Sequence, residues 1–270
     1  MQRDVTRQSR RGRLCWWGAA ALVACAFTAA CASRAPHEHA PGPSCDSAPL
    51  AANSASAAPS ASASAGAPLS ERRRLRAMLD ERLAKEKAGD AAGVKAVDDA
   101  IRERFEQPLA IMITDMSGLT KRTREEGIIS TLAQVRRLVL LAEPLLPRFG
   151  AEWIKVDADD LMIKCKSPAK LLELARALAA AVAEHNQRDP SHAIGLSIGL
   201  GYGPVLVVEH DVWGNAINTG SKLGEDVGEA GEILAAEEFI QALPADVAAS
   251  CKKEPAPEKR GSKLPFWSCQ

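Results

Sequence analysis

The residues best suited to chemistry are two aspartates that follow predicted strands. The apolar run Leu109–Ile113 leads to Asp115, and Met-Ser-Gly-Leu-Thr follows it. This pattern predicts a buried strand that delivers Asp115 to its own end, with Gly118 allowing a tight turn beside it. Asp159 lies in a second acidic segment, Asp157-Ala158-Asp159-Asp160. Carboxylates at strand ends can hold divalent cations while neighbouring backbone N–H groups face an anion.

A pattern of strands and helices surrounds these aspartates. After the first strand, apolar spacing predicts a helix over about 124–146, whose buried face contains Ile128, Leu132, Val135, Leu138 and Leu141. Strands follow at 151–156 and 161–165, then a helix over 168–185 whose buried face contains Leu171, Leu172, Leu174, Ala175, Leu178 and Val182. The last two strands, 193–200 and 205–208, are predicted to meet at a sheet turn or bulge that contains Gly199, Gly201 and Gly203.

The resulting order of strand, helix, strand, strand, helix, strand predicts an α+β fold with a ferredoxin-like βαββαβ sheet and both helices on one face. In that topology the first strand lies beside the hairpin of the second and third strands, so Asp115 and Asp159 can face each other. Two carboxylates at such close quarters repel each other unless a cation lies between them. The pair therefore favours two Mg²⁺ or Mn²⁺ ions, an arrangement suited to phosphoryl chemistry.

Composition limits the classes of function. The chain has 270 residues with 46% hydrophobic content, which predicts one globular domain with tails. Thirty-four basic and thirty-four acidic residues balance, so no overall positive field argues for nucleic acid as a partner. The seven cysteines have no CxxC spacing and do not cluster with the five histidines, which argues against a structural zinc site.

The N-terminus predicts attachment to a membrane. Residues 1–13 carry five arginines against one aspartate, and Leu14–Ser33 is uncharged, so 1–33 has the pattern of an export signal. Leu22-Val23-Ala24-Cys25 resembles the lipobox of bacterial lipoproteins, in which the cysteine receives the lipid; an uncleaved membrane anchor is the alternative. The arginine bias favours a non-cytoplasmic domain over a cytoplasmic one. Residues 34–69, rich in Ala, Ser and Pro, predict a disordered linker.

A helical stalk is predicted over 70–107. Ser70 is a suitable N-cap, and apolar residues at helical spacing continue on both sides of a break at Gly89–Gly93. Two helices joined by a short turn follow from this pattern. They either form a dimerising stalk or pack as a helical pair on the neighbouring domain.

Four segments together resemble a known family. ITDMSGLT, KVDADDLM, LSIGLGYGPV and DVWGNAINTGSKL, in this order, are similar to the signature segments of the class III adenylate/guanylate cyclase catalytic domain. The resemblance runs from about Leu109 to Leu243 and assigns 108–270 to a cyclase-like domain with a C-terminal β-hairpin extension. It implies a head-to-tail homodimer with active sites in the interface, where one protomer supplies the metal carboxylates and the other contacts the nucleotide.

The resemblance also assigns roles on the metal side of the site. Asp115 and Asp159 match the two metal-binding aspartates, and the backbone carbonyl of Met116 matches an additional ligand. The glycine that usually precedes the second aspartate is Ala158 in this chain.

On the nucleotide side, Lys155 matches the purine-contacting lysine and Asp211 its polar companion. A lysine donor with an aspartate acceptor suits adenine, because guanine presents the opposite pattern on that edge. This favours ATP as substrate, with GTP as a possible second one. Asn218 matches the asparagine that orients the ribose, whereas Lys222 replaces the family's arginine one helical turn later.

The C-terminal segment adds two expectations. Cys251 and Cys269 are symmetric about Arg260-Gly261, so antiparallel pairing of Cys251–Pro257 with Lys263–Cys269 would place their sulfurs at disulfide distance. Lys259, Arg260 and Lys263 are candidates for the family's late phosphate-binding lysine.

Together, these patterns predict a membrane-tethered adenylate cyclase that converts ATP to 3′,5′-cyclic AMP and pyrophosphate for cyclic-nucleotide signalling. The alternative is a catalytically degenerate cyclase-homology domain that dimerises or senses a ligand. Lys222 and a non-cytoplasmic location both favour that alternative, since lysine cannot fork across two phosphate oxygens and ATP is scarce outside the cytoplasm.

Overall fold

The computed structural model describes residues 70–158, 160–255 and 257–270, all within the compact unit Ala63–Gln270. The predicted export signal with Cys25 and the predicted linker lie outside these residues, as does Asp159. Within the described ranges, no helix has both the length and the apolar character needed to cross a membrane.

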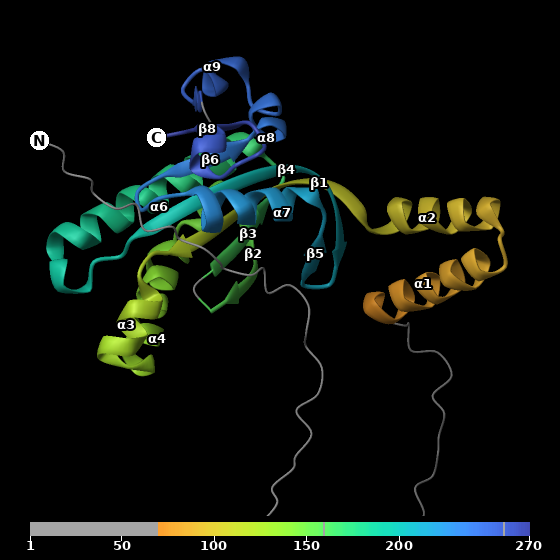
Figure 1. Cartoon of the computed structure of the whole chain (residues 1–270), viewed down its shortest axis with the longest axis horizontal. Coiled ribbons are helices and arrows are strands. Elements are labelled where there is room, and N and C mark those ends of the chain that lie inside the picture. The colour runs from red at the N-terminus through yellow and green to blue at the C-terminus, as the bar shows by residue number, and fades with distance from the viewer. Residues whose placement is uncertain (1–69, 159, 256) are drawn as a thin grey trace, which may run out of the picture. The chain divides into compact units, whose positions relative to one another are not determined.

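The described chain begins with the helical pair α1 (Glu71–Lys87) and α2 (Ala91–Phe105). Ser70 caps α1 by accepting a hydrogen bond from the N–H of Arg73, and Asp90 caps α2 by accepting one from Gly93. The predicted helices and their break are therefore confirmed. Side chains of α2 pack on the sheet domain: Val97, Ile101 and Phe105 form one buried cluster with Val208. Figure 1 shows the two helices leading into the sheet, and α2 is followed directly by the first strand.

The core of the domain is a sheet with the order β2-β3-β1-β4-β6-β8-β7, and the short strand β5 (Asp211–Trp213) pairs with β4 outside this path. Its first four strands are β1 (Glu106–Met116), β2 (Ala151–Asp157), β3 (Asp160–Cys165) and β4 (Leu196–Val208). They pair antiparallel in the order β2-β3-β1-β4. This is the predicted ferredoxin-like order, with β1 between the hairpin and the last strand.

Helices α4 (Ile128–Ala142) and α6 (Pro168–Arg188) cover one face of the sheet, as predicted. The buried side of α6 consists of the six residues expected from its spacing. The single helix expected over 124–146 is wrong, however. The chain forms α3 (Leu119–Glu126), α4 and the short α5 (Leu146–Phe149), because Gly127 takes a left-handed φ of 86° between α3 and α4. As a result Ile128 and Leu132, predicted on the buried face, are each 58% exposed.

The predicted strand pair around the glycines is also wrong, because β4 is one continuous strand that pairs with the whole length of β1. The glycines serve a different purpose. Helix α7 (Asn215–Ser221) lies on the second face of the sheet. A Cβ atom at Gly199 would lie 2.0 Å from the Gly220 carbonyl oxygen, and one at Gly201 would lie 2.1 Å from that of Ala216. Glycine in β4 therefore permits direct approach of the α7 backbone.

The C-terminal part extends the sheet. After a π-helical segment, η2 (Lys222–Val227), come β6 (Ile233–Ala236), α8 (Glu237–Gln241), α9 (Ala245–Ala248), β7 (Lys252–Lys253), a 3₁₀ turn (Pro257–Arg260) and β8 (Phe266–Ser268). β7 pairs antiparallel with β8, so the predicted hairpin is present in a short form.

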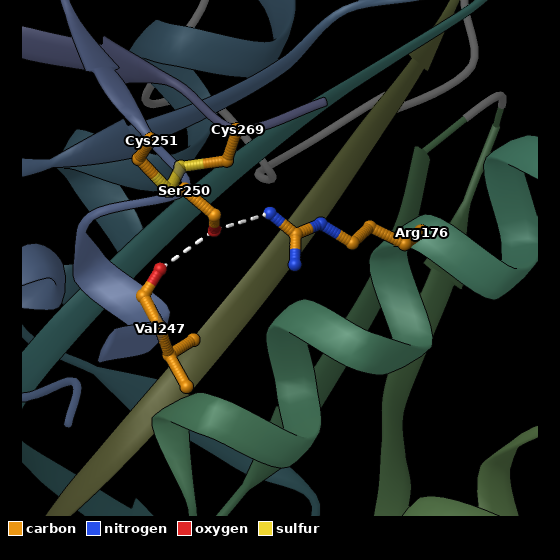
Figure 2. The surroundings of a disulfide bond; sticks show 5 residues. All are labelled: Arg176, Val247, Ser250, Cys251 and Cys269. Carbon is orange, nitrogen blue, oxygen red and sulfur yellow. Dashed lines mark hydrogen bonds between the residues drawn. A yellow bond between two sulfur atoms is a disulfide. The ribbon is translucent and has the colours of Figure 1, made fainter. Parts of the chain in front are cut away.

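A disulfide joins Cys251 to Cys269, as predicted, with 4.3 Å between the Cα atoms. Figure 2 shows Ser250 beside it. The Ser250 hydroxyl accepts a hydrogen bond from Arg176 of α6 at 2.7 Å and donates one to the Val247 carbonyl at 2.6 Å. The end of α9 is thus connected both to α6 and, through the disulfide, to the chain terminus.

Candidate active site

Asp115 is the penultimate residue of β1 and is half-buried. Because β1 is flanked by β3 and β4, its end is supported from both sides. Opposite Asp115 in the β1–β4 register lies Ser197, whose buried hydroxyl donates to the Gly224 carbonyl at 2.7 Å. Ser117, the first residue after β1, donates its N–H to the Gly195 carbonyl at 2.8 Å. The strand end that presents Asp115 is therefore held in place by its neighbour β4.

The second predicted metal ligand, Asp159, lies outside the described residues, but the strands on either side of it, β2 and β3, are described. The register of β1 and β3 pairs Ile113 with Met162, and continuing it by two residues brings Asp115 opposite Asp160. The buried Thr114 hydroxyl accepts a hydrogen bond from the N–H of Leu161 at 3.1 Å. The start of β3 is thereby held beside the end of β1, as expected from the predicted topology.

Ala158 precedes Asp159 and has a φ of 54°. This is a left-handed conformation that glycine adopts without strain and alanine rarely does. The hairpin therefore keeps a glycine-like backbone at the position where the resembled family has glycine.

The chemistry of these donors fits a hard divalent cation, since Asp115 offers a carboxylate and Met116 a backbone carbonyl. In the described ranges, no group of three or more His, Cys, Asp or Glu side chains is arranged to hold a metal, and Asp159 is not within those ranges. The described donors are thus compatible with part of a metal site.

Lys155 and Asp211 lie on strands that contact each other, β2 and β5 (Asp211–Trp213). Their sequence neighbours Ile154 and Val212 belong to the same hydrophobic cluster. The Lys155 side chain is exposed, next to an irregularity in the β2–β3 register between Trp153 and Lys155. The structure thus brings the two predicted base-contacting residues to one region of the surface, although they are 56 positions apart in the chain.

Asn218 and Lys222 are one helical turn apart, as predicted. Asn218 is an exposed residue of α7, and the N–H of Lys222 donates to its backbone carbonyl. Lys222 begins η2, and π-helical segments are often found at functional sites. The Lys222 ammonium lies 3.4 Å from the carboxylate of Asp226. Lys222 therefore has a nearby anionic partner on its own helix.

The basic residues of the C-terminal hairpin differ in their surroundings. Arg260 donates to the Val227 carbonyl at 3.1 Å and forms ion pairs with Glu232 and Glu254. The hydrogen bond to Glu232 raises the pKa of Arg260. Arg260 thus supports the end of η2, which argues against a phosphate-binding role. Lys263 is exposed, and the structure does not describe the side chain of Lys259.

Sequence reasoning missed Arg72, whose guanidinium lies 2.5 Å from Asp211 and 3.0 Å from Glu209. It stands in the run Glu-Arg-Arg-Arg-Leu-Arg, and nothing in that run distinguishes it from Arg73 or Arg74. Sequence reasoning also missed the supporting hydroxyls of Thr114 and Ser197. Polar residues inside otherwise apolar strands were the available signal for those two.

No protein-family model matches this sequence, and no curated protein matches it. Solved structures do match the fold. The catalytic core of a rhodopsin-guanylyl cyclase with converted specificity, in complex with ATPαS, has a TM-score of 0.51 at 18% identity, covering 61% of this chain and 97% of that one. The adenylyl cyclase CyaB from P. aeruginosa has a TM-score of 0.51 at 14% identity, with 61% and 94% covered. An adenylate/guanylate cyclase/hydrolase from Silicibacter pomeroyi has a TM-score of 0.50 at 20% identity, with 60% and 95% covered.

Structural matches at such low identity establish a shared fold and do not establish a shared reaction. The order of the sheet, the helices on its two faces and these structural neighbours lead to one conclusion. The described part of the chain has the fold of adenylate and guanylate cyclase catalytic domains.

Proposed function

We propose that this protein is an adenylate cyclase that converts ATP to 3′,5′-cyclic AMP and pyrophosphate. The observation that carries the proposal is the position of Asp115, near the end of β1, an interior strand of a cyclase fold, and beside the start of β3. The contacting strands that bear Lys155 and Asp211 support it.

In the proposed reaction, the 3′-hydroxyl of ATP gives its proton to water, and its oxygen forms a bond to the α-phosphorus. The bond from the α-phosphorus to the oxygen that bridges to the β-phosphate breaks, and pyrophosphate leaves. Mg²⁺ or Mn²⁺ held by Asp115, Asp159 and the Met116 carbonyl would activate the attacking oxygen and neutralise the leaving phosphates.

The remaining roles belong to side chains of the chain itself. Lys155 donates to N1 of adenine, and Asp211 accepts from its exocyclic amino group. Asn218 orients the ribose, so that the 3′-oxygen lies in line with the leaving group. Lys222 stabilises charge that develops on the transferred phosphate.

We further propose that two copies of the chain form the site. Lys155 and Asn218 are exposed in the single chain, and the nearby apolar side chains of Val156 and Trp213 are 45% and 46% exposed. Exposed apolar residues among polar recognition residues are typical of a protein interface. A homodimer would cover these residues and complete the site. The N-terminal segment would attach the protein to the membrane.

A second candidate function is ligand sensing by a catalytically degenerate cyclase domain. The specific observation in its favour is Lys222, which replaces an arginine of the resembled family and lies 3.4 Å from Asp226. A lysine so placed provides one point charge and shares it with a carboxylate. Such a domain would bind nucleotide but turn it over slowly or not at all.

The test is a turnover assay with the full chain in detergent, supplied with ATP or GTP and Mn²⁺, with cyclic nucleotide measured by mass. The proposal expects cyclic AMP from the natural chain and from Asp80→Asn, an exposed aspartate of α1, and none from Asp115→Asn. Nucleotide binding without any product would support the sensor instead. Product formation that survives Asp115→Asn would contradict the proposed enzyme.

A further inference from the structure

The start of α1 is attached to the turn that joins β4 to β5. The two turn residues are Glu209 and His210, because the register pairs Val208 with Asp211. In the first turn of α1, the backbone N–H of Arg72 donates to the Glu209 carboxylate at 3.4 Å. A carboxylate is well placed there, since the first N–H groups of a helix have no partner inside the helix and carry partial positive charge.

The side chain of Arg72 makes a second attachment. Its Nε lies 3.0 Å from Glu209, and its terminal nitrogen lies 2.5 Å from Oδ2 of Asp211. One planar guanidinium thus holds two carboxylates, an arrangement that the fork of donors on arginine permits and lysine cannot reproduce. Among the described residues, Asp211 has this arginine as its hydrogen-bonding side-chain partner.

Asp211 is the residue on which the proposed choice of adenine depends. A carboxylate discriminates between purines only where its oxygen faces the exocyclic position, because adenine donates a hydrogen there and guanine presents an acceptor. On a short three-residue strand the carboxylate of an aspartate can rotate. An ion pair that fixes one oxygen also fixes the direction of the other.

We propose that Arg72 is a positioning residue for purine selection, which acts by orienting Asp211. The inference rests on the proposed function and deepens it, since it makes the α1–α2 pair part of the base-recognition site. The hydrophobic contacts of α2 with Val208 keep the pair on the same β4–β5 hairpin. A displacement of α1 would therefore change the orientation of Asp211.

The test compares Arg72→Ala with Arg73→Ala, which removes the same charge from the adjacent, exposed position of the same helical turn. Arg72→Ala keeps the hydrogen bond from the backbone N–H of residue 72 to Glu209 and the hydrophobic cluster around Val208. These contacts should hold α1 in its position. Circular dichroism and thermal unfolding of the full chain check that both variants remain folded.

The readout is the preference for ATP over GTP, measured both as kcat/KM and as equilibrium displacement of a fluorescent ATP analogue. Arg72→Ala is expected to lower this preference about fivefold, the upper end for an ion pair between half-exposed groups. Arg73→Ala is expected to leave it unchanged, and Arg72→Lys to recover part of it. In an Asp211→Ala background, Arg72→Ala should have no further effect on the preference, because its action passes through Asp211.

An unchanged preference in a folded Arg72→Ala protein would overturn the inference, as would an equal loss in Arg73→Ala. The binding readout separates this failure from failure of the proposed enzyme. If the natural chain binds ATP in preference to GTP without forming product, the proposed reaction fails, and the effect of Arg72→Ala on binding still decides the role of Arg72. If the natural chain shows no preference in either readout, the inference is wrong.

Discussion

Lys222 is the position where a single side chain has the largest consequence for the proposed reaction. It lies at the junction of α7 and η2, one turn after Asn218 and 3.4 Å from Asp226. Its ammonium can stabilise negative charge on one phosphate oxygen, whereas a guanidinium can contact two oxygens at once in a fixed geometry. The helix that carries it is well supported, because Leu223 and Val227 of η2 pack on Phe266.

Lys222→Arg is therefore expected to raise kcat with ATP by at least about tenfold, because a second donor would contact the transition state. Lys222→Ala is expected to lower kcat. Initial rates of cyclic AMP formation at saturating ATP and Mn²⁺ measure both effects. A lower rate in Lys222→Arg than in the natural chain, with Asn218 intact, would contradict this prediction. It would show that Lys222 does not act as a weaker substitute for the family's arginine.

At the scale of elements, the contact between β4 and α7 positions Asn218 and Lys222 over the sheet. This contact requires glycine at Gly199 of β4, but it has room for a side chain at Gly220 of α7. A Cβ atom at Gly199 would lie 2.0 Å from backbone, whereas the nearest atom to a Cβ at Gly220 would lie 3.5 Å away, an ordinary contact. The same interface thus offers a disruptive substitution and a matched permissive one.

Gly199→Ala is expected to destabilise the domain by at least about 3 kcal/mol, because neither backbone can move aside without breaking the sheet or the helix. Gly220→Ala is expected to be nearly neutral, since alanine favours the helix. Urea unfolding followed by tryptophan fluorescence gives the two free energies of unfolding. Equal costs for both substitutions would refute direct backbone packing of α7 on β4.

Asp90 caps the N-terminus of α2 and so contributes to the stability of the helical pair. The N–H of Gly93 donates to this carboxylate and lowers its pKa. A lowered folded-state pKa means that the unfolded chain binds the proton first. The contribution of Asp90 to stability is therefore complete above the ordinary carboxyl pKa and is lost as pH falls below about 4.

Asp90→Ala should consequently lower the thermal stability of α2 at pH 7, where the carboxylate caps the helix. Asp90→Asn should retain the cap, because its amide oxygen accepts the same hydrogen bond. Between about pH 5 and pH 3, the range over which carboxyl groups titrate, it should lose less stability than the natural chain. Thermal melts followed at 222 nm across this range compare the three proteins. A loss in Asp90→Asn as steep as in the natural chain would assign the acid sensitivity to other groups.

At the scale of the whole molecule, the disulfide closes the C-terminal part onto the sheet. Cys269 donates its N–H to the Ile233 carbonyl of β6 at 2.8 Å, and its partner Cys251 follows α9. Between them, β8 places the fully buried Phe266 against Leu223 and Val227 of η2. The chain terminus is thus mechanically connected to the helix segment that carries Lys222.

Replacement of both Cys251 and Cys269 by Ala is expected to cost about 3 kcal/mol, because the crosslink spans 18 residues and restricts the unfolded chain. Chemical denaturation with and without a reducing agent measures this cost. The reductant should lower the stability of the natural chain to the level of the double variant and leave the variant unchanged. A natural chain that is insensitive to the reductant while the variant is weaker would instead indicate lost packing of the sulfurs.

Prediction from the sequence succeeded where local pattern and burial agree. In α6, apolar spacing identified every buried residue, because one long amphipathic helix on one sheet face has a single way to hide its apolar side. It failed for 124–146, because Gly127 breaks the helix and turns two expected core residues outward. It also failed for the glycines of β4, whose alternation resembles a turn and instead marks close approach by another backbone.

The sequence by itself determined the ferredoxin-like order of β1 to β4, the cap at Ser70, the cysteine pairing and the cyclase-like set of candidate residues. These features follow from residues close together in the chain or from the symmetry of short segments. Only the tertiary structure decided that β4 is continuous, that α7 lies on its glycines and that Arg72 holds Asp211. Each of these depends on contacts between residues far apart in the sequence, where side-chain type alone specifies no partner.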